Sequence, residues 1–238
     1  MKRLLVLSLI LLCAHTVVAQ DWAKDALAKS SLKHEWAMLG SVKAFVAYPA
    51  GMQKRPVCVM VTGDKGLTDW SQDMADQIAG MGYVVVAPDL TGVSDVSGTL
   101  AAAADYGQKQ PQASMVLMSV GFGRGATEAF QFATERNVAA TMVFYGPSPA
   151  GADFSKIQGD LFGFYAASDT ATDSTVAATQ AKLKAAQVVM EDVTYDGTGA
   201  GFMESGMSPS ATPAEKKAVS YALDRMKIVM EMVALRGY

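Results

Sequence analysis

Histidine and cysteine, the side chains that most often carry hydrolytic or metal chemistry, are scarce in this sequence. The 238 residues contain two histidines, His15 and His34, and two cysteines, Cys13 and Cys58. A Zn²⁺ site needs a cluster of nitrogen and sulfur ligands, which these residues do not supply. We therefore expect no metal site. A covalent hydrolytic mechanism also needs a base beside its nucleophile, and only two histidines are present that could serve as that base.

A glycine-rich turn with the sequence GFGRG, at residues 121–125, is the strongest local motif. It follows the apolar run Ser114–Ser119 and opens a helical pattern. This is the setting of G-x-nucleophile-x-G, a sharp turn that presents its central side chain above a sheet. Here the central residue is Gly123, which has no side chain. The N–H groups of Gly123, Arg124 and Gly125 are instead expected at a helix N-terminus, which favours anions.

The same segment fits the dinucleotide fingerprint G-x-G-x-x-A, from Gly121 to Ala126. The strand expected next, Thr141–Phe144, has no acidic residue at its end to bind a ribose. We therefore expect no NAD and no other cofactor.

The N-terminal segment has the pattern of a secretory signal peptide. Lys2 and Arg3 give it a positive start, an apolar stretch follows, and the small residue Ala19 ends it. The apolar stretch is too short to span a membrane, and no later stretch approaches that length. Cleavage after Ala19 would leave Gln20 as the first residue of an exported chain, periplasmic or extracellular. We expect residues 20–238 to form one domain.

Charge and composition exclude several classes of protein. Removal of residues 1–19 would take away two positive charges and no negative ones, so the formal net charge would change from −3 to −5. With no cluster of Lys and Arg, the chain is a poor candidate for binding nucleic acid. Half of the residues are apolar and 18% are charged, which excludes a disordered chain. Cys58 alone would remain, so no disulfide within the chain is expected.

Six short apolar runs alternate with amphipathic stretches. Nearly continuous apolar character is typical of strands buried on both faces of a parallel sheet. The alternation predicts an α/β fold with a doubly wound, mainly parallel sheet flanked by helices. A further strand, Val42–Tyr48, is expected to pair antiparallel near an edge. The six runs are Val57–Thr62, Tyr83–Ala87, Ser114–Ser119, Thr141–Phe144, Leu161–Tyr165 and Gln187–Thr194.

Helices are predicted from apolar spacing and from glycine positions. They cover an entry segment, the stretch before Gly82, the residues after the glycine-rich turn, one later stretch and the C-terminal region. The predicted ranges are Asp21–Lys33, Trp70–Met81, Gly125–Ala133, Ser174–Ala186 and Val219–Val233.

Three segments, in chain order, resemble the dienelactone hydrolase family of the α/β-hydrolase fold. Residues 82–90, GYVVVAPDL, resemble that family's GY-x-x-x-x-PDL strand. Residues 120–126, VGFGRGA, resemble its G-F-C-x-G-G turn, and residues 195–202, YDGTGAGF, resemble its Y-x-G-x-x-H-x-F segment. The match runs from about residue 42 to 205. It implies an α/β-hydrolase fold and, by analogy, ester or lactone hydrolysis.

The resemblance also implies where the catalytic residues would lie. It puts the nucleophile at Gly123, the histidine at Ala200 and the acid at Asp169. Two of the three triad members are therefore missing. The family's oxyanion hole falls on the backbone of Arg124 and Asp64. The guanidinium of Arg124 would add a positive charge there, unless it pairs with Asp64 or Asp169.

Other residues are poor replacements for the missing groups. Ser119 lies inside an apolar run, and Ser148 and Ser168 would each still need a base. His34 precedes the first predicted strand, whereas this fold supplies its histidine after the last one.

Three hypotheses about function remain. The first is an exported protein that is non-catalytic or very weakly hydrolytic and binds a small anionic or carboxylated ligand at Gly123, Arg124, Gly125 and Asp64. The second is an ester or lactone hydrolase with a non-standard site around Asp169, Arg124 and a rim serine or tyrosine. The third is a scaffold whose pocket has filled in. An open cleft above Gly123 would argue against the scaffold.

Overall fold

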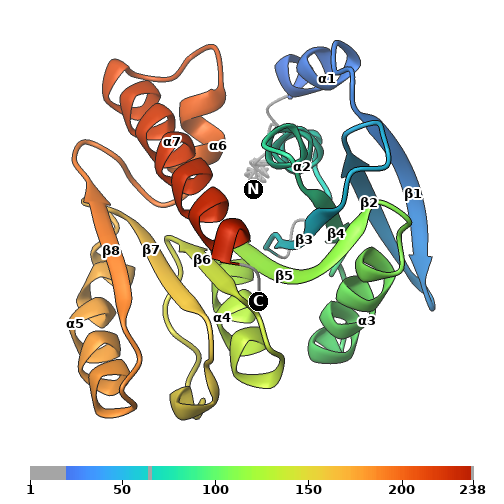
Figure 1. Ribbon diagram of the computed structural model, residues 1–238. Helices are drawn as coiled ribbons and strands as arrows, with labels where there is room; N and C mark the ends of the chain where they lie inside the picture. The colour runs from blue at the N-terminus through green and yellow to red at the C-terminus, as the bar shows by residue number, and fades with distance from the viewer. Residues whose placement is uncertain (1–19, 64–65, 237–238) are drawn as a thin grey trace, which may run out of the picture.

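Eight strands form one sheet with helices on both of its faces, as the ribbon of the computed structural model shows (Figure 1). The structure describes residues 20–63 and 66–236. The predicted signal peptide, residues 1–19, and Asp64 lie outside the described residues. Within them, none of the helices combines the length and the apolar composition that a membrane crossing requires.

The strands lie in the order β1-β2-β4-β3-β5-β6-β7-β8. All neighbours from β4 to β8 pair in parallel, whereas β2 is antiparallel to both β1 and β4. This confirms the predicted doubly wound, mainly parallel sheet. The strands are β1 (Lys33–Leu39), β2 (Val42–Tyr48), β3 (Arg55–Val61), β4 (Val84–Pro88), β5 (Ala113–Phe122), β6 (Ala140–Phe144), β7 (Asp160–Ala166) and β8 (Met190–Tyr195).

The six predicted apolar runs correspond to β3–β8, and their burial explains why they were recognisable. Every residue of β4 and β6 is buried, because helices cover both faces of the sheet there. The last run begins later than predicted. Gln187 has a φ of 61°, and its N–H donates to Lys184 in a turn, so β8 starts only at Met190.

The N-terminal part of the sheet differs from the prediction. The entry helix ends at Ala28 instead of Lys33, and Lys33 begins an edge strand, β1, that was not predicted. The prediction for β2 is confirmed, since β2 pairs antiparallel and lies second from the edge. His34 therefore lies inside a strand. Burial alternates at the end of β1, where Ala37 and Leu39 are buried and Met38 is exposed. The strand begins with three polar residues, so it does not stand out in the sequence as an apolar run.

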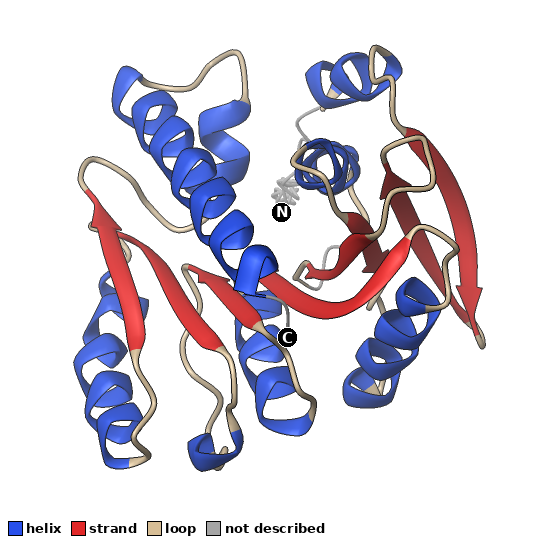
Figure 2. Ribbon diagram, viewed as in Figure 1, coloured by secondary structure: helices blue, strands red, loops and turns tan. Residues whose placement is uncertain are grey.

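The helices divide between the two faces of the sheet (Figure 2). Helices α1, α2, α6 and α7 cover one face, and α3, α4 and α5 cover the other, together with a short 3₁₀ turn at Phe154–Lys156. The helices are α1 (Asp21–Ala28), α2 (Asp69–Gly80), α3 (Val96–Gln108), α4 (Arg124–Glu135), α5 (Thr170–Ala185), α6 (Phe202–Met207) and α7 (Pro213–Arg236). The four later predicted helices fall on α2, α4, α5 and α7.

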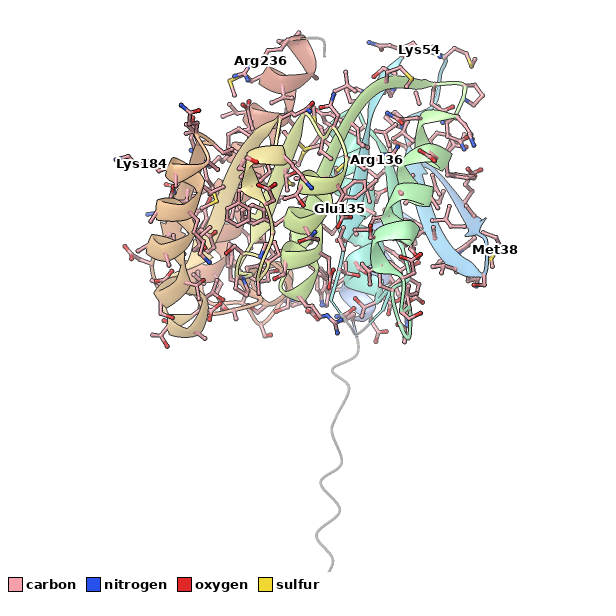
Figure 3. All side chains as sticks on the ribbon, turned by 90° about the horizontal axis from the view of Figure 1, so that it is seen from below. Met38, Lys54, Glu135, Arg136, Lys184 and Arg236 are labelled. Atoms are coloured by element: carbon pink, nitrogen blue, oxygen red, sulfur yellow. The ribbon has the colours of Figure 1, made fainter. Side chains whose placement is uncertain are left out.

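Helices α3, α4 and α5 lie side by side on their face of the sheet, as the view turned by 90° shows (Figure 3). Arg136, which follows α4, reaches across to α3, where its Nη2 donates to Asp105 at 2.7 Å. Small side chains on α4, such as Ala126 and Ala129, are fully buried. The helix therefore lies close to the sheet.

Two glycines allow the backbone of α4 to approach the strands. A Cβ placed on Gly125 would lie 2.3 Å from the carbonyl oxygen of Val61, at the end of β3. A Cβ placed on Gly121 would lie 2.2 Å from the carbonyl oxygen of Gly125. These neighbours are backbone atoms, which cannot turn away as a side chain does. The glycines therefore fix the distance between β3, β5 and the start of α4.

We predict that Gly125→Ala destabilises the fold by about 3 kcal/mol or more, because the added methyl forces the backbones apart. For a chain of this length the melting temperature should fall by about 6–12 °C. Differential scanning calorimetry measures this. Gly199→Ala is the matched control, since a Cβ at Gly199 meets nothing within 4 Å. Equal melting temperatures for the two variants would contradict the close approach.

One buried carboxyl makes stability depend on pH. Asp73 on α2 is only 3% exposed. Burial raises the pKa of its carboxyl from 3.8 to about 6, against the effect of a hydrogen bond from Gln77 and with a contribution from the charge of Asp76. The folded chain therefore binds this proton more tightly than the unfolded chain. The resulting stabilisation is complete below about pH 4 and is lost as the pH rises through about 6.

Asp73→Asn should therefore raise the free energy of unfolding by about 1–3 kcal/mol at pH 7.5 and by clearly less at pH 5. The amide keeps an oxygen to accept the hydrogen bond from Gln77 and carries no charge to bury. Urea unfolding at the two pH values measures the difference. Asp196→Asn, on an exposed loop, is the control. A gain that is the same at both pH values would contradict a raised pKa at Asp73.

Candidate functional site

Gly123 forms the sharp turn between β5 and α4. Its φ is 58° and its ψ is −123°, a backbone conformation that glycine adopts far more easily than residues with a Cβ. A positive φ at its centre suits a sharp strand-to-helix turn. The turn therefore has the geometry of a strand-to-helix elbow, and its central residue projects no side chain.

The end of β6 holds the elbow in place. The N–H of Gly123 donates to the carbonyl oxygen of Phe144 at 2.9 Å, and a Cβ on Gly146 would lie 2.3 Å from the carbonyl oxygen of Gly123. The N–H of Gly123 is therefore already used, which corrects the expectation that it faces a ligand. The N–H groups of Arg124 and Gly125 have no hydrogen-bond partner in the described chain.

A pocket of about 300 Å³ opens above the elbow. Its lining comes from the segments that follow the carboxyl ends of β3, β5, β6 and β8, the usual place for a ligand in an α/β sheet. Gly123 and Ala200 both line it, as the resemblance predicted. The lining residues are Thr62, Gly63, Gly66, Thr68, Trp70, Ser71, Phe122, Gly123, Arg124, Tyr145, Ala200, Gly201 and Glu204.

Tyr145 is the most unusual residue of the pocket. It is 7% exposed and has a φ of 41°, an outlier for a bulky residue. A Cβ at Gly123 would lie 4.0 Å from its ring atom Cε2. Its hydroxyl has no hydrogen-bond partner in the part of the chain that the structure describes. Burial raises the pKa of Tyr145 well above its ordinary value, and the charge of Glu204 raises it further, so the phenol keeps its proton.

Glu204, on the short helix α6, contributes a carboxylate to the pocket. Its Oε1 accepts a hydrogen bond from Nε2 of Gln20 at 2.6 Å, and Oε1 of Gln20 accepts from the N–H of Trp70 at 2.8 Å. Neither Glu204 nor Tyr145 was predicted from the sequence as a site residue. Their positions were a usable signal, because Tyr145 directly follows β6 and Glu204 lies four residues after Ala200.

Two other candidate residues lie differently from what was expected. The guanidinium of Arg124 lies 3.7 Å from the carboxylate of Glu128 along α4 and is 65% exposed, and it does not pair with Asp169. Asp169 follows β7, but its carboxylate accepts from the N–H of Thr172 and caps α5. It does not line the pocket. Asp64 lies outside the described residues.

The serines considered as replacement nucleophiles also lie outside the pocket. Ser119 is fully buried and bonds to Thr141 through its hydroxyl at 2.9 Å. Ser148 bonds to Thr179 at 2.8 Å. Ser168 is exposed beyond the end of β7.

His34 and Cys58 are equally remote from this chemistry. Nε2 of His34 lies 2.6 Å from Oδ1 of Asp76 on α2, and His34 does not line the pocket. Cys58 is buried inside β3, where burial raises the pKa of its thiol to about 12. Neither residue can act as base or nucleophile at the elbow. Among residues 20–63 and 66–236, no three His, Cys, Asp or Glu side chains gather as metal ligands would.

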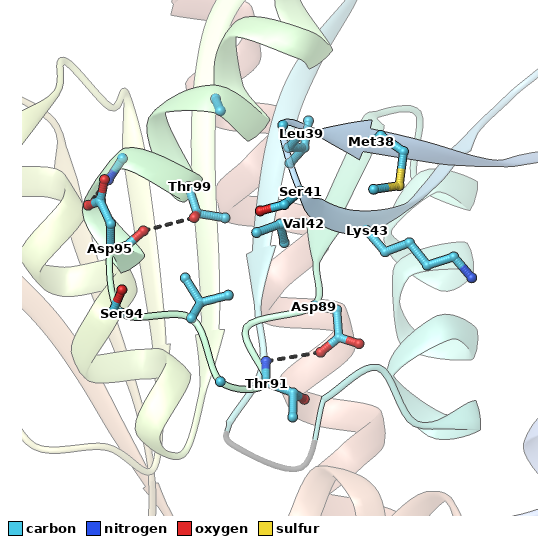
Figure 4. Close-up of a pocket in the computed structure, with 15 residues that line it drawn as sticks. Met38, Leu39, Ser41, Val42, Lys43, Asp89, Thr91, Ser94, Asp95 and Thr99 are labelled. Atoms are coloured by element: carbon cyan, nitrogen blue, oxygen red, sulfur yellow. Dashed lines mark hydrogen bonds between the residues drawn. The ribbon is translucent and has the colours of Figure 1, made fainter.

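A larger hollow of about 830 Å³ lies elsewhere, between the β1–β2 turn and the start of α3 (Figure 4). Its carboxylates serve local structure. Asp89 accepts from the N–H of Thr91 at 3.0 Å, and Asp95 accepts from the N–H of Gly98 at 2.9 Å as the cap of α3. We therefore place the candidate site at the elbow.

The chain matches a "Putative hydrolase fragment YghX" of Escherichia coli at 38% identity over 60 residues, which is 25% of this chain. The matched segment spans half the length of that relative.

Solved structures share the fold at low sequence identity. A "Putative Dienelactone Hydrolase" from Klebsiella pneumoniae superposes with a TM-score of 0.74 and 17% identity, covering 85% of this chain and 99% of the other. A dienelactone hydrolase-like promiscuous phosphotriesterase from metagenomic libraries superposes with a TM-score of 0.72 and 17% identity. The match covers 85% of this chain and 98% of the other. An esterase from Pyrobaculum calidifontis superposes with a TM-score of 0.69 and 17% identity, and the match covers 88% of this chain and 91% of the other.

The family model itself covers most of the sheet and the elbow. The dienelactone hydrolase family model matches residues 42–97 and 91–233, which include every strand from β2 to β8 and all of the pocket-lining residues. The chain therefore belongs to the dienelactone hydrolase family.

Proposed function

We propose that this protein is a non-hydrolytic or very weakly hydrolytic member of its family that binds a small carboxylated ligand above the elbow. The observation that carries the proposal is the pairing of Gly123 with Ala200 in one pocket. The family resemblance assigns the nucleophile to Gly123 and the histidine to Ala200. Glycine has no side chain and alanine has only a methyl group, so neither residue can attack a carbonyl carbon or accept a proton. No thiol and no imidazole lines the pocket in the described chain.

Three features support ligand binding. The pocket has a volume of about 300 Å³, at the lower end of the range for small-molecule sites, which argues against a scaffold with a filled cleft. The N–H groups of Arg124, which lines the pocket, and of Gly125, which does not, are free at the start of a twelve-residue helix, where they favour a carboxylate. The hydroxyl of Tyr145, which forms no hydrogen bond within the described chain, supplies a third donor, since it keeps its proton.

The pocket's own hydroxyls offer little support for covalent chemistry. Ser71 donates to the carbonyl oxygen of Thr68 at 2.7 Å, and Thr68 accepts from the N–H of Ser71 to cap α2. No base lies beside either hydroxyl among the lining residues. An activated nucleophile needs such a base.

The alternative, a hydrolase with a non-standard site, has its best support in Tyr145. The ring of Tyr145 lies beside the empty nucleophile position, and its strained backbone is of the kind found at functional sites. A protonated phenol suits hydrogen bonding to a developing oxyanion better than attack on a carbonyl. If the purified chain hydrolyses activated esters and Tyr145→Phe abolishes that turnover, the alternative is correct.

We further propose that the protein is exported and that residues 1–19 are removed by cleavage after Ala19. The proposal rests on the positive charges and the apolar stretch at the N-terminus. Edman or mass analysis of the protein recovered from its own host would identify the first residue, which this proposal puts at Gln20.

Ester hydrolysis by the unaltered chain should be very slow or undetectable. Loss of a triad can leave an acceleration of about 10³–10⁴ over water from binding and the oxyanion donors. Initial rates with p-nitrophenyl acetate and with an activated lactone measure this directly. Turnover at the level of an ordinary esterase, with kcat of about 1 s⁻¹ or more, would contradict the proposal.

Restoring the missing groups tests the assignment of the two positions. Gly123→Cys alone should gain little, because no base lies nearby, and it also places a Cβ at a φ of 58°. Gly123→Cys combined with Ala200→His should hydrolyse activated esters faster than either single variant, by about tenfold or more. Gly123→Cys with Gly199→His is the matched control. If the control equals the first double variant, Ala200 is not the position of the histidine.

A further inference from the structure

Glu204 gives the pocket a charge that the family resemblance did not anticipate. Among the described lining residues, the charged side chains are Glu204 and Arg124. The guanidinium of Arg124 lies beside Glu128 and is 65% exposed, so it is already balanced at the surface. Glu204 is half-buried, and its closest partner is the neutral amide of Gln20. The charge that the pocket presents to a ligand near Glu204 is therefore negative.

The carboxylate of Glu204 has no cationic partner in the described chain. No Lys, Arg or His of residues 20–63 and 66–236 lies within 4.0 Å of it. Only its Oε1 receives a hydrogen bond, from Gln20. A carboxylate withdrawn from water is matched best by a positive charge. One face of Glu204 is therefore available for a cation supplied by a ligand.

The walls of the pocket suit the same kind of ligand. Trp70 and Phe122 meet edge to face at a ring-centroid distance of 5.3 Å, and Phe122 and Tyr145 lie 6.4 Å apart. All three rings line the pocket. The face of an aromatic ring attracts a cation, and such rings recur around ammonium ligands. Glu204 also lies near enough to Tyr145 for its charge to raise the pKa of that phenol.

We propose that the pocket selects ligands with a positively charged nitrogen, which pairs with the carboxylate of Glu204 against the rings of Trp70, Phe122 and Tyr145. The inference rests on the proposed function, in which the N–H groups of Arg124 and Gly125 bind a carboxylate. Together they describe a small zwitterion, with its carboxylate at the elbow and its ammonium group at α6.

Three probes of similar length separate the two ends of such a ligand. 4-Aminobutanoate carries both charges, pentanoate replaces the ammonium group by a methyl, and pentylamine lacks the carboxylate. Isothermal titration calorimetry with the full chain should give a Kd for 4-aminobutanoate about tenfold or more below that for pentanoate, the effect of one charge-assisted hydrogen bond. Glu204→Gln keeps an acceptor for Gln20 and should remove that difference.

Glu135→Gln is the matched control. It also removes one negative charge, but from the exposed far end of α4. It should leave the preference for 4-aminobutanoate unchanged. A melting temperature of Glu204→Gln close to that of the unaltered chain would show that the variant is folded.

Each result decides between the two proposals. If pentanoate binds as tightly as 4-aminobutanoate, and Glu204→Gln changes neither, the cation site is refuted and the carboxylate site survives. If pentylamine binds as tightly as 4-aminobutanoate and loses affinity in Glu204→Gln, the cation site is supported and the carboxylate site is refuted. If none of the three probes binds, both proposals are wrong.

Discussion

The close approach of α4 to the strands is the constraint on which the rest of the site depends. Gly121 and Gly125 leave no room for a Cβ between β5, the helix and the end of β3. Gly123, between them, is locked to the end of β6 through its N–H and its carbonyl oxygen. The elbow is therefore set by backbone contacts alone. It keeps its shape whether or not a catalytic side chain stands on it.

This independence explains how the fold can persist with altered chemistry. A residue with a Cβ at position 123 would have to adopt the same positive φ, and that strain is tolerated where a nucleophile requires it. Glycine removes the strain together with the side chain. What remains above the sheet are two free N–H groups, the phenol of Tyr145 and the carboxylate of Glu204. In the proposed function these groups bind and orient a ligand.

The sequence predicted most of the sheet, because strands that are buried on both faces, such as β4 and β6, consist almost entirely of apolar residues. It failed at β1, an edge strand whose first three residues, Lys33, His34 and Glu35, are polar. The elbow was predictable from glycine spacing. Glu204 was signalled only by its position four residues after Ala200, since its place in the pocket also depends on how α6 folds back over the sheet. The partner of Arg124 could have been predicted, because Glu128 lies four residues further along the predicted helix, where opposite charges pair. Contacts between segments far apart in the chain are what the sequence pattern leaves out.

The account depends most on the absence of an activated nucleophile above the elbow. Intact-protein mass spectrometry after incubation with a fluorophosphonate, which labels activated hydroxyl groups, measures this directly. We expect an unchanged mass for the chain at neutral pH, with a serine hydrolase labelled fully in the same mixture. A stoichiometric phosphonyl adduct on a pocket hydroxyl, such as Ser71 or Tyr145, would contradict the account.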